Sequence, residues 1–107
     1  MANISLLSAF YLLGFQINAL PVSSGTTTLN GKQNFVRADA TSGNVIINLP
    51  ATGGQPITIK RIDATANTIT VSGNGINIDG TASVTIKNQN DSFSFWYDTA
   101  SNTYNVA

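Results

Sequence analysis

The chain has 107 residues, of which only 9% are charged, and its five basic and five acidic residues give a formal net charge of zero. This balance provides no basic surface for nucleic acid or for an anionic membrane. Cysteine and histidine are both absent, which excludes disulfides, cysteine or histidine zinc sites and histidine-based acid–base catalysis. We therefore expect one small domain, without a metal or cofactor, that depends on packing or on partner subunits for its stability.

Residues 1–20 form the most apolar part of the chain, and the first basic side chain is that of Lys32. A signal peptide would begin with basic residues, and a membrane-spanning helix would need roughly 20 predominantly apolar residues, whereas several polar residues interrupt this segment. We expect an apolar attachment segment that contacts neighbouring subunits or a larger particle. Two alternatives are strands of the domain core and a secreted adhesin-like subunit that is processed after Ala19.

The leucines at positions 6, 13 and 20 recur every seven residues, a spacing typical of a short helical bundle. The apolar side chains that we expect to dock are those of Ile4, Leu6, Leu7, Phe10, Tyr11, Leu13, Phe15, Ile17 and Leu20.

Short runs of alternating isoleucine, valine and threonine follow, separated by turn residues. Residues 21–33 are rich in serine, threonine and glycine and predict a linker or a loose first strand. Beyond them, the runs expected as strands lie at residues 34–37, 45–49, 57–60, 69–72, 76–78, 84–86, 93–97 and 104–106. About seven or eight strands predict an all-β module over residues 34–107, either an antiparallel β-sandwich or a jelly-roll-like domain.

Charged residues are too sparse to indicate a catalytic or metal site. Asp63 and Asp79 could share a proton or bind Ca²⁺, but two carboxylates are too few ligands for such a site. Asp79 also precedes a glycine, which is typical of a tight turn. We expect Lys60 and Arg61, the only adjacent basic pair, to be solvated strand residues or partners in ion pairs between subunits.

Three aromatic residues lie in the last two expected strands, Trp96, Tyr97 and Tyr104. Aromatic rings in strands usually fill a core. Planar rings also stack on sugars, so that these three residues are the candidate platform for a glycan.

The order of strand and turn sequences provides a resemblance. The sequences that carry it are Leu49-Pro50, Ile57-Thr58-Ile59-Lys60, Thr68-Ile69-Thr70-Val71, Ile78-Asp79-Gly80, Val84-Thr85-Ile86, Phe95-Trp96-Tyr97-Asp98 and Asn102-Thr103-Tyr104. Together they resemble a β-module of tailed-bacteriophage virion proteins, which occurs in tail fibres, head fibres and capsid decoration proteins. The resemblance covers about residues 34–107.

What the resemblance implies is a non-enzymatic structural protein located in the virion, a capsid decoration, head-fibre or short fibre subunit. It also implies a homotrimer in which residues 1–20 attach to capsid or tail proteins. A role in host attachment would add a surface glycan as a partner.

Overall fold

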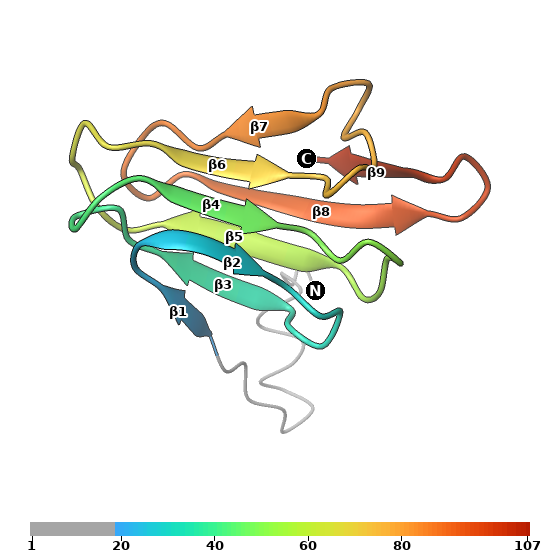
Figure 1. The fold of residues 1–107 in the computed structure, drawn as a ribbon, viewed down its shortest axis with the longest axis horizontal. Coiled ribbons are helices and arrows are strands. Elements are labelled where there is room, and N and C mark those ends of the chain that lie inside the picture. The colour runs from blue at the N-terminus through green and yellow to red at the C-terminus, as the bar shows by residue number, and fades with distance from the viewer. Residues whose placement is uncertain (1–18) are drawn as a thin grey trace, which may run out of the picture.

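The computed structural model describes residues 19–107, which form nine β-strands and no helix. The strands of the first sheet, sheet A, are β1 (Leu20–Val22), β3 (Phe35–Ala38), β5 (Ile57–Arg61), β8 (Ser92–Asp98) and β9 (Thr103–Val106). Those of the second sheet, sheet B, are β2 (Gly25–Thr28), β4 (Val45–Asn48), β6 (Ile69–Ser72) and β7 (Ser83–Thr85). The all-β prediction is confirmed for this part of the chain (Figure 1). In residues 19–107 there is also no helix of the length and apolarity that a membrane crossing requires.

The first six strands alternate between the two sheets, and this alternation makes neighbouring strands parallel. β1, β3 and β5 pair in parallel in sheet A, as do β2, β4 and β6 in sheet B. Only β7, β8 and β9 join their neighbours in antiparallel fashion. The predicted antiparallel topology is therefore wrong for the pairings among these six strands, and both sheets are mixed. A jelly roll, which is built from antiparallel strands, does not describe the domain.

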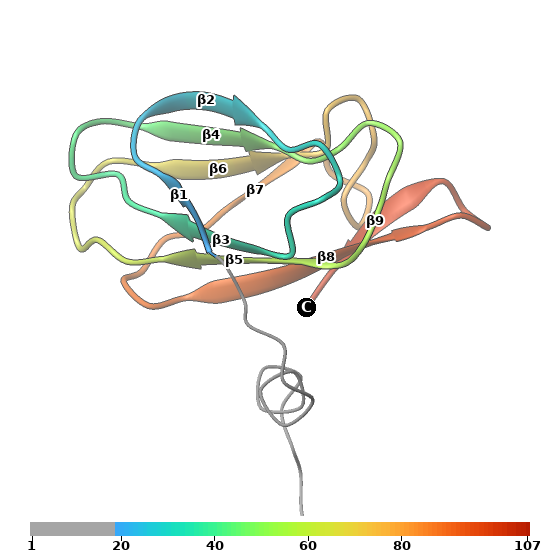
Figure 2. The same cartoon turned by 90° about the horizontal axis from the view of Figure 1, so that it is seen from below.

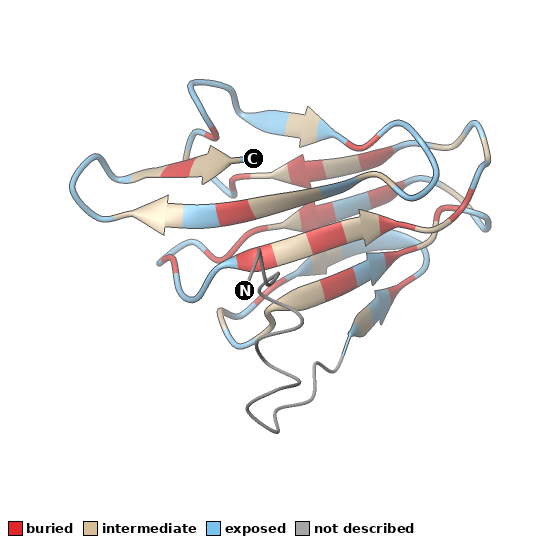
Figure 3. Ribbon diagram, turned by 180° about the vertical axis from the view of Figure 1, so that it is seen from behind, coloured by how far each residue is buried: buried red, intermediate tan, exposed pale blue. Residues whose placement is uncertain are grey.

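Side chains from both sheets meet in one core. Along β4, Val45 and Ile47 are fully buried, whereas Ile46 between them is 42% exposed. This alternation follows from the two-residue period of a strand, and Figure 3 shows it along most strands. Figure 2 shows the two sheets as layers on either side of the core. The buried apolar residues are Val22, Leu29, Val36, Ala38, Ala40, Val45, Ile47, Leu49, Ile57, Ile59, Ile69, Val71, Ile78, Ile86, Phe95 and Tyr104.

Residues 21–33, expected to be a linker or a first strand, contain most of β1 and all of β2. Val22 and Leu29 are 5% and 2% exposed, so both ends of this segment contribute to the core. The threonine-rich part of this segment is β2, a short strand at the edge of sheet B, where alternate side chains face solvent.

The segment at residues 76–78 is not the expected strand. Ile76 N–H donates to the Gly73 carbonyl at 3.1 Å, which turns the chain, and Ile78 forms only isolated bridges. Asp79 and Gly80 then adopt φ angles of 46° and 86°, both positive as a two-residue hairpin turn requires. The predicted Asp-Gly turn is confirmed.

Candidate functional site

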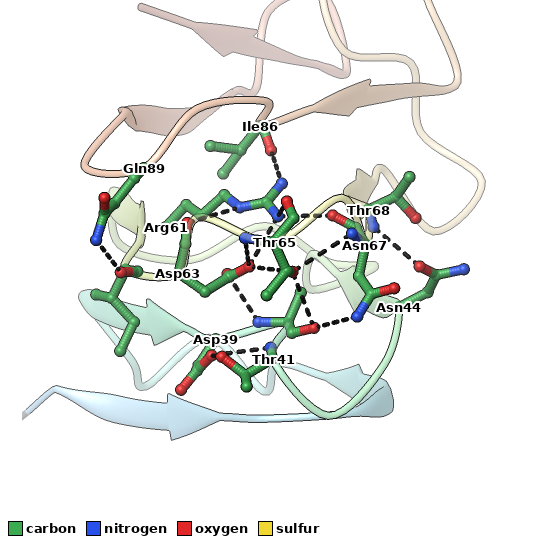
Figure 4. A network of polar contacts seen from close by, with 12 residues as sticks. Asp39, Thr41, Asn44, Arg61, Asp63, Thr65, Asn67, Thr68, Ile86 and Gln89 are labelled. Carbon is green, nitrogen blue, oxygen red and sulfur yellow. Dashed lines mark hydrogen bonds and ion pairs between the residues drawn. The ribbon is translucent and has the colours of Figure 1, made fainter.

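Arg61, the last residue of β5, lies at the centre of a buried polar cluster (Figure 4). It continues the alternation of Ile57 and Ile59, so its side chain points into the domain, and it is only 2% exposed. Its Nη2 atom lies 2.8 Å from Oδ2 of Asp63, whose side chain is 3% exposed. The expectation of a solvated or inter-subunit Arg61 is therefore wrong, because the ion pair is buried within the chain.

The Arg61 guanidinium also donates hydrogen bonds to main-chain carbonyl oxygens. Nη1 donates to Ile86 at 2.9 Å, and Nη2 donates to Thr65 at 2.9 Å and to Asn67 at 2.6 Å. Nε lies 3.3 Å from the Asp63 carbonyl oxygen. One side chain thus joins the β5–β6 loop to the residue that follows β7.

The Asp63 carboxylate extends the cluster to the β3–β4 loop. Its Oδ1 accepts a hydrogen bond from the Ala40 N–H at 2.8 Å, and its Oδ2 accepts from the Thr65 hydroxyl at 2.6 Å and from the Thr65 N–H at 3.1 Å. Burial alone raises the pKa of this carboxyl, but the hydrogen bonds from Arg61, Ala40 and Thr65 outweigh burial and hold its pKa well below the usual range.

This geometry is that of a structural ion pair. A general base must reach a substrate and have a pKa near the working pH, whereas Asp63 is buried and its pKa is lowered. Asp79 engages a different partner, because its Oδ2 accepts from the Val106 N–H at 3.3 Å. Within residues 19–107, no group of three or more histidine, cysteine, aspartate or glutamate side chains could hold a metal ion.

The three aromatic residues of the candidate glycan platform do not share one surface. Trp96 and Tyr97 are neighbours on β8, so that their side chains lie on opposite faces of sheet A. Tyr104 is 2% exposed, and its hydroxyl donates to the Pro50 carbonyl. The rings of Tyr97 and Tyr104 pack edge to face with centroids 5.4 Å apart. Trp96, at 41% exposed, is the one open ring of the three.

The expected docking residues lie almost wholly outside the described part of the chain. Leu20 starts β1, is half-buried and packs against the core. The other apolar residues of this set fall within residues 1–18, which are not described.

The outer face of sheet B is uncharged. Hydroxyl and amide side chains occupy it, together with the exposed Ile46. The polar residues are Thr26, Thr28, Asn48, Thr70, Ser72, Ser83 and Thr85. Such a face carries no charge that would repel another copy of the chain.

Comparisons with known proteins do not assign a family. No protein-family model matches the sequence, and no match appears among curated proteins.

Proposed function

We propose that this chain is a non-enzymatic structural subunit of a bacteriophage virion, a capsid decoration, head-fibre or short fibre protein. Its two sheets form a sandwich-like module that is displayed on the particle, and residues 1–20 attach it to capsid or tail proteins. The subunit associates with itself as a homotrimer.

The observation that supports this proposal is where the residues of the resemblance lie. Leu49 and Pro50 follow β4, while Ile57–Lys60 and Ile69–Val71 belong to β5 and β6. The Asp79-Gly80 pair makes a hairpin turn. These residues therefore build strands and turns of a scaffold, and the buried polar cluster around Arg61 has the geometry of a structural ion pair.

The test compares particles produced with and without an intact gene for this chain. In particles made with the intact gene, mass spectrometry should detect the protein and electron cryomicroscopy should show a surface density. Both should be missing from particles made without it. Purified chain should rebind to the deficient particles, and sedimentation equilibrium should give the mass of a trimer. Particles that never contain the protein would contradict the proposal.

Attachment through the N-terminal segment has its own matched pair of variants. Leu13→Asp should abolish rebinding, because it places a charge among the expected docking side chains. Ser8→Asp changes a polar position of the same segment, and it should leave rebinding nearly intact. Equal binding by both variants would place attachment elsewhere.

A second function is favoured by the exposure of one ring. Trp96 is 41% exposed and lies opposite Asn105 on β9, a combination of planar ring and amide that suits a sugar. If Trp96 binds a glycan, host polysaccharide should change its fluorescence. Trp96→Ala should remove binding, whereas Tyr104→Phe, a change in the core, should not. No fluorescence response across a range of host polysaccharides would reject it.

A further inference from the structure

Four strands form the edges of the two sheets, β1 and β9 in sheet A and β2 and β7 in sheet B. An edge strand exposes N–H and C=O groups that can pair with another chain, and proteins usually cover or block such edges. The edge of β9 is covered. Tyr104 N–H donates to the Asn77 carbonyl at 2.9 Å and its own carbonyl accepts from Asp79 N–H at 2.9 Å, while the Asp79 carboxylate accepts from Val106 N–H at 3.3 Å.

The β1 edge is blocked by a proline. The Val22 carbonyl accepts from Asp39 N–H at 2.9 Å, so Val22 bonds toward the sheet interior. Main-chain direction alternates along a strand, which places Pro21 at the position whose N–H would face outward, and proline has no N–H. The β7 edge is partly occupied, because the Ser83 carbonyl accepts from the Thr81 hydroxyl at 3.1 Å.

The β2 edge has neither the main-chain cover of β9, nor the proline of β1, nor the side-chain hydrogen bond of β7. Gly25 N–H donates to Asn44 at 3.2 Å and Leu29 N–H donates to Asn48 at 2.9 Å, so the odd-numbered residues bond toward β4. The N–H and C=O groups of Thr26 and Thr28 therefore point away from the sheet, and no main-chain partner for them lies within residues 19–107. The strand sequence Gly-Thr-Thr-Thr contains neither charge nor proline.

We propose that β2 pairs in antiparallel fashion with β2 of a second copy across a two-fold axis, which joins two copies of sheet B into one sheet. A two-fold contact must be self-complementary, and an uncharged strand in a chain of zero net charge meets its own copy without repulsion. Thr26 then forms hydrogen-bonded pairs with Thr28 of the second copy, and Thr27 lies on the axis. This contact goes beyond the proposed function, because it is two-fold and would join neighbouring trimers or form a dimer.

The absence of cysteine permits a sharp test in the full chain. On the axis, the two Thr27 residues form a pair without main-chain hydrogen bonds, whose Cα atoms lie about 4.5 Å apart, within the range that a disulfide bridges. Thr27→Cys should therefore yield a disulfide-linked dimer under mild oxidation. Thr26→Cys is the matched control, because diagonal neighbours of this kind lie about 7–8 Å apart, and it should stay largely uncrosslinked.

A blocking variant tests the same contact without cysteine. Thr28→Pro removes an outward-facing N–H, as Pro21 does in β1. Sedimentation velocity should show that this variant loses the concentration-dependent two-fold association expected of the unmodified chain, while a trimer is retained. Thr28→Val keeps that N–H and should still associate. If thermal melting shows that Thr28→Pro is unfolded, the double change Thr26→Lys with Thr28→Lys replaces it, because like charges would then oppose each other.

Three results would overturn the proposal. The first is an unmodified chain whose sedimentation shows no association at any concentration, which would indicate that another segment or another protein covers β2. The second is equal crosslinking of Thr27→Cys and Thr26→Cys, which would indicate random collision. The third is unchanged association of the folded blocking variant. The first result would also contradict the proposed homotrimer. None of the three bears on whether virions contain the protein, which purified particles test separately.

Discussion

The guanidinium of Arg61 connects three loops through a single side chain. It bonds directly to the carbonyls of Thr65, Asn67 and Ile86, and it reaches Ala40 through the Asp63 carboxylate. A planar group with five donors in fixed directions can serve several acceptors at once, whereas an ammonium group is a compact charge. The cluster therefore depends on the shape of arginine as well as on its charge.

We predict that Arg61→Met lowers the free energy of unfolding by about 3–5 kcal/mol, because it leaves the buried Asp63 carboxylate without its ion-pair partner. Arg61→Lys should also destabilise the chain, since lysine retains the charge but cannot reach the same set of carbonyls. Chemical denaturation followed by circular dichroism measures both changes. Lys60→Met is the matched control on the other face of β5, and it should cost less than about 1 kcal/mol. Equal losses at positions 60 and 61 would contradict the assignment.

The lowered pKa of Asp63 makes part of the stability depend on pH. In the unfolded chain this carboxyl has a pKa of about 3.9, and in the folded chain its pKa is well below that value. The stabilisation is thus complete at neutral pH, begins to fall as the pH drops through the unfolded pKa, and is lost as the pH approaches the folded pKa. We predict that Asp63→Asn, although less stable at pH 7, flattens the decline in unfolding free energy below about pH 4.

Denaturation midpoints measured between neutral and strongly acidic pH provide this test. Asp98→Asn, which changes a carboxylate at the end of β8, should retain the unmodified decline. If Asp63→Asn declines as steeply as the unmodified chain, the carboxyl does not couple to folding.

The burial of Arg61 could have been predicted from the sequence. Positions 57, 59 and 61 share one face of a strand, and the first two are isoleucines. Asp63, two residues further on, is the nearest acid that could pair with it. The contact with Ala40 could not be predicted, because it joins residues 23 positions apart through loops whose paths depend on the whole fold.

At the scale of the strands, the alternation of apolar and polar residues in the sequence predicted the positions of most strands. The segments around residues 34–37, 45–49, 57–60, 69–72 and 93–97 all overlap observed strands. Strand direction could not be predicted in the same way, because a period of two is the same in parallel and antiparallel strands. The loop sequences are compatible with parallel and with antiparallel pairing, since a loop can return the chain to its own sheet or carry it across to the other sheet.

The turn after β6 depends on a glycine at a close main-chain approach. A Cβ atom at Gly73 would lie 1.6 Å from the Ile76 carbonyl oxygen and 2.8 Å from its carbon, so the backbone would have to move. We predict that Gly73→Ala lowers the free energy of unfolding by about 2–3 kcal/mol. Gly75→Ala meets no atom within 4 Å but has a φ of +92°, and it should cost about 1 kcal/mol from backbone strain alone. Thermal melting of both variants checks that Gly73→Ala is the more destabilising of the two. A larger loss for Gly75→Ala would show that the turn rearranges freely around a Cβ atom at position 73.

At the scale of the whole molecule, the two sheets share one core. The buried cluster includes Ile47 and Val71 from sheet B together with Ile59 and Phe95 from sheet A. A sheet that separated from the other would expose its half of this cluster to water, at a cost of about 25 cal/mol for each Å² of apolar surface. The sheets should therefore unfold together.

We predict that a change in sheet B alters the unfolding of sheet A to the same extent. Ile47→Ala removes a fully buried side chain in β4 and should lower the free energy of unfolding by about 2–5 kcal/mol. Trp96, the only tryptophan, reports from β8 in sheet A. Its fluorescence and the circular dichroism of the whole chain should show the same shifted midpoint, as a two-state transition requires.

The adjacent residue provides the matched control for this experiment. Ile46→Ala truncates the same side chain on the same strand, but at a position that is 42% exposed, so its cost should stay below about 1 kcal/mol. A Trp96 midpoint that does not move with Ile47→Ala, while circular dichroism does, would show that the sheets unfold separately. In that case the shared core would not couple them, and pairing of β2 with a second copy would stabilise sheet B alone.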